Sequence, residues 1–71
     1  MKGKIRKWLD FRGYGFIKPE KENDDIFVHI SSFKAEDYYL IKEGLEVEFD
    51  VKKTYKGLEA ENVRIPVQIE I

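Results

Sequence analysis

The chain has 71 residues, of which 38% are charged, with a net charge of −1 and no cysteine. A chain of this length has one modest core, so we expect residues 1–71 to form a single domain. The lack of cysteine excludes a disulfide framework and a thiolate metal site. No apolar run approaches the roughly 20 residues of a membrane span, and MKGKIRKW lacks the apolar stretch of a signal peptide, which indicates a soluble cytoplasmic protein.

The charges are segregated along the chain. Residues 1–18 hold six basic side chains against one acidic residue, Asp10, a local charge of +5, so residues 19–71 carry −6. A local basic surface can attract phosphate while the remainder stays acidic. A nucleic-acid partner is therefore compatible with the net charge, although a solvated face rich in lysine would give the same excess. The six basic residues are Lys2, Lys4, Arg6, Lys7, Arg12 and Lys18.

Short apolar segments separated by turn signals predict an all-β chain. We expect strands at 3–9, 14–19, 25–30, 45–52 and 58–65. DFRG joins the first two strands, the polar EKENDD joins the second to the third, and TYKG joins the last two. The longer SSFKAEDYYLIKEG has room for one helical turn with Ser31 or Ser32 as its N-cap. After Pro66 the tail VQIEI (67–71) alternates again and would lengthen the last strand or cover an edge.

Five short strands leave exposed edges in a domain of this size unless the sheet closes on itself. We therefore expect a five-stranded antiparallel barrel whose interior takes one parity of side chains from each strand. The outward row of the fourth strand is then acidic, with Glu46, Glu48 and Asp50. The expected inward residues are Ile5, Ile17, Ile26, Val28, Ile30, Leu45, Val47, Phe49, Val51 and Val63.

Two stretches, RGYGFI (12–17) and DIFVHI (25–30), alternate rings with small or aliphatic residues. Because the aliphatic side chains fill the core, the alternation places Tyr14, Phe16, Phe27 and His29 on the outer face of neighbouring strands. Contiguous exposed apolar surface usually marks an interaction site. The alternative is that Phe16 and Phe27 fold inward or form a cross-strand pair that only stabilises the sheet.

The first strand adds positive charge to this region. Arg6 and Trp8 share a parity that brings both to the ring face, whereas Lys7 has the parity of Ile5 and Leu9 and needs a bulge or a place at the barrel rim to reach water. Rings interleaved with cations stack unpaired bases while the cations neutralise phosphates. This combination predicts a single-stranded nucleic acid as the partner and disfavours duplex.

The motifs resemble those of the cold-shock protein family, one-domain OB-fold barrels that bind single-stranded RNA and DNA. RGYGFI is similar to the first ribonucleoprotein motif of the family, K-G-[FY]-G-F-I, and DIFVHI to the second, V-F-V-H-F. LIKEGLEVEFDV and KGLEAENV are similar to its fourth strand and its K-G-x-x-A-x-N-V ending, so the resemblance covers about residues 2–65 and leaves a tail at 66–71.

The resemblance implies that Tyr14, Phe16, Phe27 and His29 stack on bases. It also implies that Tyr38 offers a ring from the long loop, that Lys56 is the basic residue of the last hairpin, and that the protein is a passive RNA chaperone. Whether RNA or DNA is the main ligand stays open, because ring faces do not sense the 2′-hydroxyl.

The first strand departs from the family pattern, since K-W-F appears here as RKWL. Counting without gaps from Gly3 to Gly13 puts Lys7 in the place of the tryptophan and Trp8 in that of the phenylalanine. Alternatively, Trp8 keeps its own place and the following loop is one residue shorter. One ring is lost in either case, and Ile30 replaces the aromatic that usually ends the second motif, so we expect a smaller platform.

Other functions have weaker support. His29 lies near two serines, but there is no second histidine or glycine elbow for a catalytic triad, and Glu22, Asp24 and Asp25 lack the ligand spacing of a calcium site. We expect a monomeric, non-enzymatic protein with no cofactor, metal or small-molecule substrate. A barrel that receives a polypeptide on the same rings remains the rival, and salt dependence distinguishes the two. The predicted nucleic-acid-binding residues are Arg6, Lys7, Trp8, Arg12, Tyr14, Phe16, Lys18, Phe27, His29, Tyr38 and Lys56.

Overall fold

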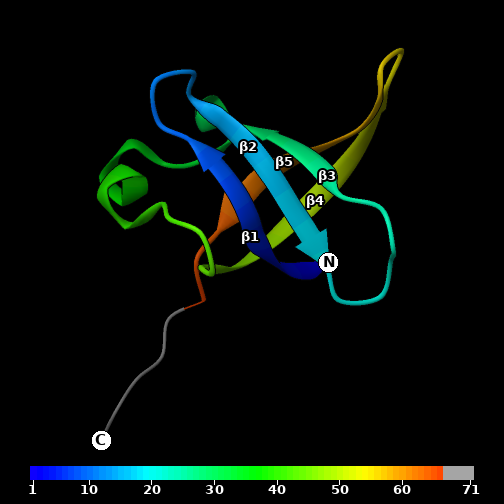
Figure 1. Cartoon of the computed structure of the whole chain (residues 1–71), viewed down its shortest axis with the longest axis horizontal. Coiled ribbons are helices and arrows are strands. Elements are labelled where there is room, and N and C mark those ends of the chain that lie inside the picture. Colours follow the sequence, from blue (N-terminus) through cyan, green and yellow to red (C-terminus); the bar gives the residue numbers. More distant parts are fainter. Residues whose placement is uncertain (67–71) are drawn as a thin grey trace, which may run out of the picture.

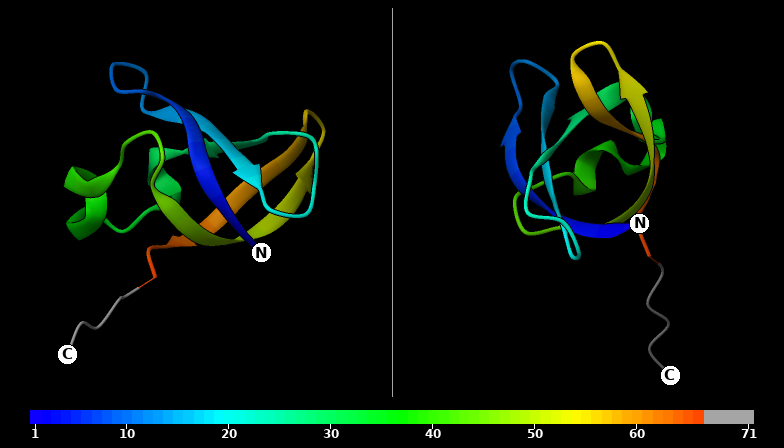
Figure 2. Two further views of the ribbon diagram at one scale, coloured as in Figure 1. Left: turned by 60° about the horizontal axis from the view of Figure 1, so that its bottom comes forward. Right: turned by 90° about the vertical axis from the view of Figure 1, so that its right-hand side faces the viewer.

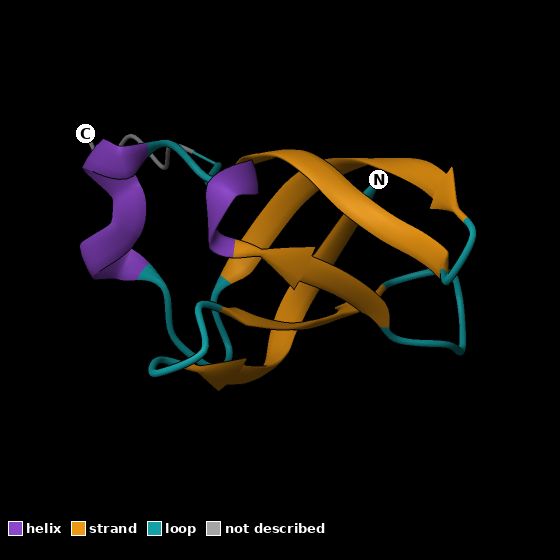
Figure 3. Cartoon of the chain, turned by 90° about the horizontal axis from the view of Figure 1, so that it is seen from above, coloured by secondary structure: helices purple, strands orange, loops and turns teal. Residues whose placement is uncertain are grey.

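Strands of four to nine residues make up about half of the chain in the computed structural model, which describes residues 1–66 (Figure 1). Within this range the strands are β1 (Lys2–Leu9), β2 (Tyr14–Pro19), β3 (Ile26–His29), β4 (Glu46–Thr54) and β5 (Gly57–Arg64). Two short 3₁₀ helices, η1 (Ile30–Ser32) and η2 (Ala35–Leu40), lie together at one end of the barrel (Figure 3). The expected strands are confirmed to within two residues at each end, and the prediction for the tail at 67–71 lies outside the described residues.

The strands close into a barrel in the order β1-β2-β3-β5-β4, and pairing of β4 with β1 completes the ring (Figure 2). The predicted all-β, five-stranded barrel is therefore confirmed. The strand pairs are antiparallel except β3 with β5, which run parallel at Phe27 and Glu59. A ring with an odd number of strands cannot alternate direction at every seam, so the expectation of a wholly antiparallel barrel is wrong at this one.

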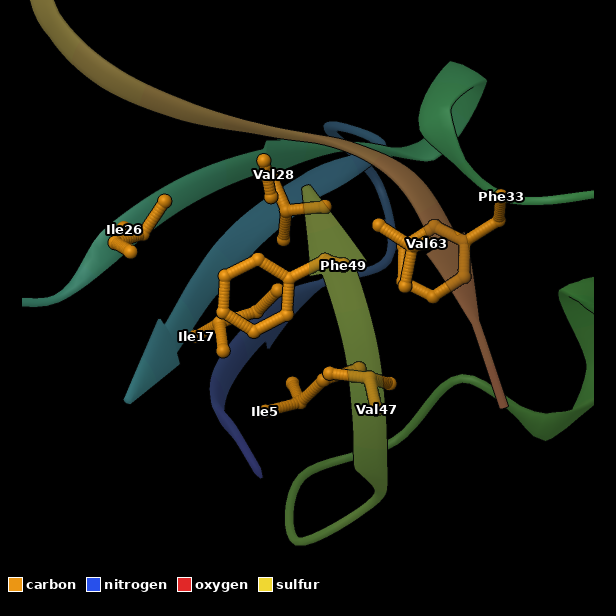
Figure 4. Packing of buried hydrophobic residues seen from close by; sticks show 9 residues of the cluster. Ile5, Ile17, Ile26, Val28, Phe33, Val47, Phe49 and Val63 are labelled. Carbon is orange, nitrogen blue, oxygen red and sulfur yellow. The ribbon is translucent and has the colours of Figure 1, made fainter. Parts of the chain in front are cut away.

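The core is aliphatic with two phenylalanines, and Figure 4 shows these side chains gathered inside the barrel. Three residues expected there are only half-buried: Ile30 belongs to η1, Leu45 precedes β4, and Val51 packs against the edge of the core. Phe33, which follows η1, and Ala60 on β5 are buried although neither was expected in the core. The buried cluster consists of Ile5, Ile17, Ile26, Val28, Phe33, Val47, Phe49, Ala60 and Val63.

A bulge in β1 changes which of its side chains face inward. The register with β2 runs from Ile5 opposite Ile17 directly to Lys7 opposite Phe16, so Arg6 is the extra residue. Beyond the bulge Lys7 faces outward and is exposed. The requirement that Lys7 reach water is met by this bulge.

The same bulge turns Trp8 toward the core. Trp8 lies opposite the buried Gly15, is half-buried, and packs edge to face on Phe33 with ring centroids 5.8 Å apart. A side chain at position 15 would overlap the Lys7 carbonyl oxygen and approach Cε3 of Trp8 to 2.7 Å, so this position requires glycine. The expectation that Trp8 shares the outward face with Arg6 is therefore wrong, because the extra residue reverses the parity after it.

A second irregularity lies where β4 pairs with β5. Between Glu48 opposite Arg64 and Asp50 opposite Glu61, the single residue Phe49 faces two residues of β5. One of these, Asn62, has a φ of 51°, the left-handed conformation that a bulge residue often adopts.

The helical turn after β3 begins earlier than expected. His29, not a serine, is the N-cap of η1, because its Nδ1 accepts a hydrogen bond from the backbone N–H of Ser31 at 3.1 Å. The strand consequently ends at His29, and Ile30 is its successor in the 3₁₀ turn. No helix among residues 1–66 is long and apolar enough to cross a membrane.

Candidate nucleic-acid interface

Three rings from β2 and β3 meet on the outside of the barrel. Gly15 and Ile17 on β2, like Ile26 and Val28 on β3, point inward, so the alternate positions project outward. We call these outward rings, Tyr14, Phe16 and Phe27, the ring cluster. Their centroids lie 5.4 Å (Tyr14 to Phe27), 6.0 Å (Phe16 to Phe27) and 6.4 Å (Tyr14 to Phe16) apart.

The ring cluster is half-buried, although it lies outside the core. Phe16 and Phe27 are directly opposite each other in the β2–β3 register, so they do form a cross-strand pair, but neither folds inward. Each ring is partly covered by its neighbours, and part of each side chain stays exposed to solvent.

His29 extends the ring face at the end of β3. It lies opposite Tyr14 in the register and is exposed. Its Nδ1 accepts a hydrogen bond from the Ser31 backbone N–H and lies 2.9 Å from the Ser31 hydroxyl oxygen. These contacts with Ser31 fix the orientation of the imidazole ring. The sequence-predicted ring positions of the two motifs are thus brought together.

Two exposed lysines border the ring cluster. Lys7 lies opposite Phe16 on the neighbouring strand, and Lys18 follows Phe16 on the outward row of β2. Neither ammonium forms an ion pair with a carboxylate of residues 1–66. Both are therefore available to an anionic ligand.

The remaining predicted cations lie around this centre. Lys56, in the β4–β5 turn, lines a hollow of about 430 Å³ together with Phe16 and Phe27. Arg12 is exposed in the turn before β2. The guanidinium of Arg6 is 3.6 Å from the Asp25 carboxylate, so its charge is already partly engaged.

Tyr38 is less closely connected to the ring cluster. It lies on η2 with 41% of its surface exposed. Among the described residues no ring contact joins it to Tyr14, Phe16 or Phe27. The structure brings neither Tyr38 nor Trp8 into the ring cluster.

The acidic row of β4 lies on the other side of β1 from the ring cluster. Glu46 and Glu48 oppose Lys4 and Lys2, with nitrogen-to-oxygen distances of 4.0 Å and 3.8 Å. Hydrogen bonds from the Asn62 amide and the Arg64 guanidinium lower the pKa of Asp50, which keeps this exposed carboxylate charged. No group of three or more His, Asp or Glu side chains within residues 1–66 could hold a metal ion.

The family description "'Cold-shock' DNA-binding domain" matches residues 1–66 of the chain. The chain belongs to this family. A cold shock-like protein of Thermotoga maritima is 42% identical over 66 residues, which are 92% of this chain and 97% of the relative. Cold shock-like protein CspD of Escherichia coli K12 is 39% identical over 69 residues, 97% of this chain and 92% of the relative.

A solved structure supports the fold independently. The structure titled drosophila Unr CSD456 superposes with a TM-score of 0.74 at 21% identity. The match covers 99% of this chain but only 28% of that longer chain. At this identity the likeness establishes the barrel alone.

In the first strand of this cold-shock domain, the side chains after the bulge are placed as follows. Lys7, and not Trp8, occupies the outward place opposite Phe16, while Trp8 packs toward Phe33. β1 therefore places a cation beside the ring cluster, where a ring was expected.

The exposed apolar residues that the sequence reasoning missed include Phe11, Tyr55 and Leu58. The Lys56 ammonium lies 5.7 Å from the centroid of the Tyr55 ring. Each residue belongs to a turn or borders one, where small polar residues are the rule. The turn sequences DFRG and TYKG could have predicted the exposure of Phe11 and Tyr55, because a large ring in a tight turn has no strand neighbours to cover it.

Proposed function

We propose that this cold-shock domain binds single-stranded RNA or DNA, stacking bases on the ring cluster and His29 while lysine and arginine neutralise the backbone. The observation that carries the proposal is the outward ring cluster, beside which Lys7 and Lys18 form no ion pair with a carboxylate of residues 1–66. Duplex is a poor ligand for such a surface, because paired bases keep their faces stacked on one another.

The size of the ring cluster is sufficient for useful affinity. Each base stacked on an aromatic side chain contributes roughly 1–3 kcal/mol. Three rings and an imidazole can therefore support micromolar binding, which corresponds to about −8 kcal/mol, before any phosphate contact. Stacking does not select strongly among bases, so the surface suits a protein that holds many different single strands.

An RNA chaperone is the role that best fits such binding. A protein that captures unpaired segments shifts weak secondary structure toward the open form by mass action and needs no catalytic group. Arg6, Arg12 and Lys56 would contribute phosphate contacts at the border, whereas Trp8 and Tyr38 would have secondary roles because they lie outside the ring cluster. Binding without catalysis, a monomeric state and a cytoplasmic location stay predictions.

A salt titration with matched oligonucleotides tests the proposal. We expect a fluorescently labelled single strand to bind and a hairpin duplex of the same composition to bind far more weakly. The affinity for the single strand should fall as salt rises, since phosphate contacts release counterions. Equal affinity for single strand and duplex would contradict base stacking, and a salt-independent affinity would favour the polypeptide partner.

A further inference from the structure

A hydrogen-bonded turn keeps the Phe11 side chain exposed to solvent. The backbone N–H groups of Arg12 and Gly13 both donate to the Leu9 carbonyl, at 3.0 Å and 2.9 Å, and Gly13 has a φ of 69°, which suits glycine. The Gly13 carbonyl in turn accepts the Ile30 N–H at 2.8 Å, which fastens the turn to η1. At the tip of this fixed turn the Phe11 side chain is fully exposed.

A single exposed phenylalanine on a protein surface needs no special explanation. Phe11, however, lies in the turn that leads into β2, whose first residue is Tyr14 of the ring cluster (Figure 1). It also borders a hollow of about 600 Å³. This hollow is lined by Trp8, Leu9, Asp10, Phe11, Arg12 and Tyr14.

The hollow begins where the ring cluster ends. Tyr14 belongs to both, so a strand of bases that crosses Phe27 and Tyr14 reaches the hollow next. The bulge in β1 has turned Trp8 toward Phe33, which leaves this end of the interface without an outward ring from β1. Of the three rings that line the hollow, Trp8 and Tyr14 are half-buried, and Phe11 is the one that is fully exposed.

We propose that Phe11 is a further base-stacking residue, which covers the base bound in the hollow beyond Tyr14 while Arg12 contacts the adjoining phosphate. This inference rests on the proposed function, because it names an additional subsite of the same single-stranded ligand. Phe11 would supply the outward ring that β1 lacks because its bulge turns Trp8 inward.

Charge favours a nucleic acid over a polypeptide or a second copy of this chain as the occupant. Residues 1–18, which include the turn, carry a local charge of +5. Arg12 lines the hollow and Lys7 is exposed on the adjoining strand, while Asp10 is the only carboxylate among the lining residues. A polyanion with planar bases matches both the cations and the exposed rings.

The test compares four variants in a binding titration with labelled oligothymidine. Phe11→Ala removes the ring, Phe11→Leu keeps apolar bulk without an aromatic face, and Phe11→Trp keeps the face. Tyr39→Ala is the control, because Tyr39 is a ring on η2 that is 83% exposed and makes no contact with the ring cluster among the described residues. Thermal unfolding should be unchanged in the Phe11 variants, since the side chain packs on nothing.

We expect Phe11→Ala and Phe11→Leu to weaken binding about 5- to 100-fold, the effect of losing one stacked base, with Phe11→Trp close to the wild type. Tyr39→Ala should change affinity less than about twofold, within the scatter of neutral surface changes. The loss should shrink with an oligonucleotide of about three bases, which can occupy the ring cluster without entering the hollow.

The outcomes separate this inference from the proposed function. If the wild type binds no single strand, both are overturned. If the wild type binds and Phe11→Ala binds equally well, the Phe11 subsite alone is overturned. If Phe11→Leu binds with wild-type affinity, the side chain makes only an apolar contact, and the inference of base stacking is overturned. A change of sedimentation coefficient in Phe11→Ala without a change in binding would make Phe11 a contact between copies of the chain, which also overturns the inference.

Discussion

Phe16 and Phe27 face outward from the barrel and also stabilise the sheet as a cross-strand pair. Their ring centroids lie 6.0 Å apart across the β2–β3 seam, and each side chain is half-buried by its neighbours. Aromatic pairs of this kind contribute about 0.5–1.5 kcal/mol beyond the area they bury. The rings therefore help to stabilise the sheet, although they are absent from the buried core cluster.

Phe16→Ala and Phe27→Ala should each weaken the free energy of binding by roughly 1–3 kcal/mol, because each removes one stacking face. Each should also lower the free energy of unfolding by about 1–3 kcal/mol, because each phenylalanine makes two ring pairs within the ring cluster. Oligonucleotide titration and urea unfolding of the same samples measure the two effects.

Phe33→Ala provides the contrast to these variants. Phe33 is 5% exposed within the core, so its truncation should cost roughly 3–5 kcal/mol of stability. If Phe16→Ala or Phe27→Ala were as unstable as Phe33→Ala, that ring would belong to the core and not to the interface.

At the scale of the elements, the bulge in β5 depends on a left-handed residue. Asn62 has a φ of 51°, and Ala60 and Val63 both point into the core although they are three positions apart. A regular strand would send one of them outward, since its side chains alternate. The bulge is what allows both to be buried.

Comparing Asn62→Gly with Asn62→Ala isolates this backbone requirement. Both variants lack the 3.4 Å hydrogen bond from the Asn62 amide to Asp50, but only alanine carries a Cβ into the left-handed region, at a cost of roughly 1–2 kcal/mol. We expect the glycine variant to be more stable by about 1 kcal/mol in urea unfolding. In a regular strand glycine would be the less stable of the two, so that order would disprove the bulge.

The same irregularities mark the limit of what the sequence could predict. Strict alternation in RGYGFI and DIFVHI placed Tyr14, Phe16, Phe27 and His29 outward, because no extra residue interrupts those strands. In β1 the parity of Lys7 indicated a bulge or a place at the barrel rim, but R-K-W contains no glycine or proline to decide between them. The parity count was therefore carried past Arg6 without a shift, and Trp8 was assigned to the wrong face.

The long connection between β3 and β4 shows a second limit. Phe33 is buried against the barrel from a segment with no strand periodicity, and its packing depends on residues distant in sequence, such as Trp8. Alternation rules say nothing about such a side chain. Phe11, in contrast, could have been noticed, since a ring in a tight turn is conspicuous in the sequence itself.

At the scale of the whole molecule, charge is sorted around the barrel. β1 separates β4 from β2 in the strand order, and Lys2 and Lys4 on β1 face the acidic side chains of β4. Lys7 and Lys18 lie toward the ring cluster and have no carboxylate partner among residues 1–66. The net charge of −1 is therefore compatible with exposed cations beside the ring cluster.

Lys7→Gln with Lys18→Gln tests whether this local charge, and not the overall field, governs binding. The double variant should bind more weakly, and its slope of log affinity against log salt should fall by about 0.7 for each single-strand phosphate that a lysine no longer neutralises. Arg6 is the poorer choice, because Asp25 already engages its guanidinium at 3.6 Å. A salt titration of oligothymidine binding measures both the affinity and the slope.

Glu46→Gln with Glu48→Gln is the matched control, since it changes the net charge by the same amount in the opposite direction. The ion pairs that it breaks are exposed and 4.0 Å and 3.8 Å long, so the fold should tolerate their removal. Exposed charges more than about 10 Å from the ligand are screened at 0.1 M salt, so a contact site should respond only weakly to this change. If the glutamate variant gains as much affinity as the lysine variant loses, the ligand extends over β1 to β4, and the ring cluster is only part of its path.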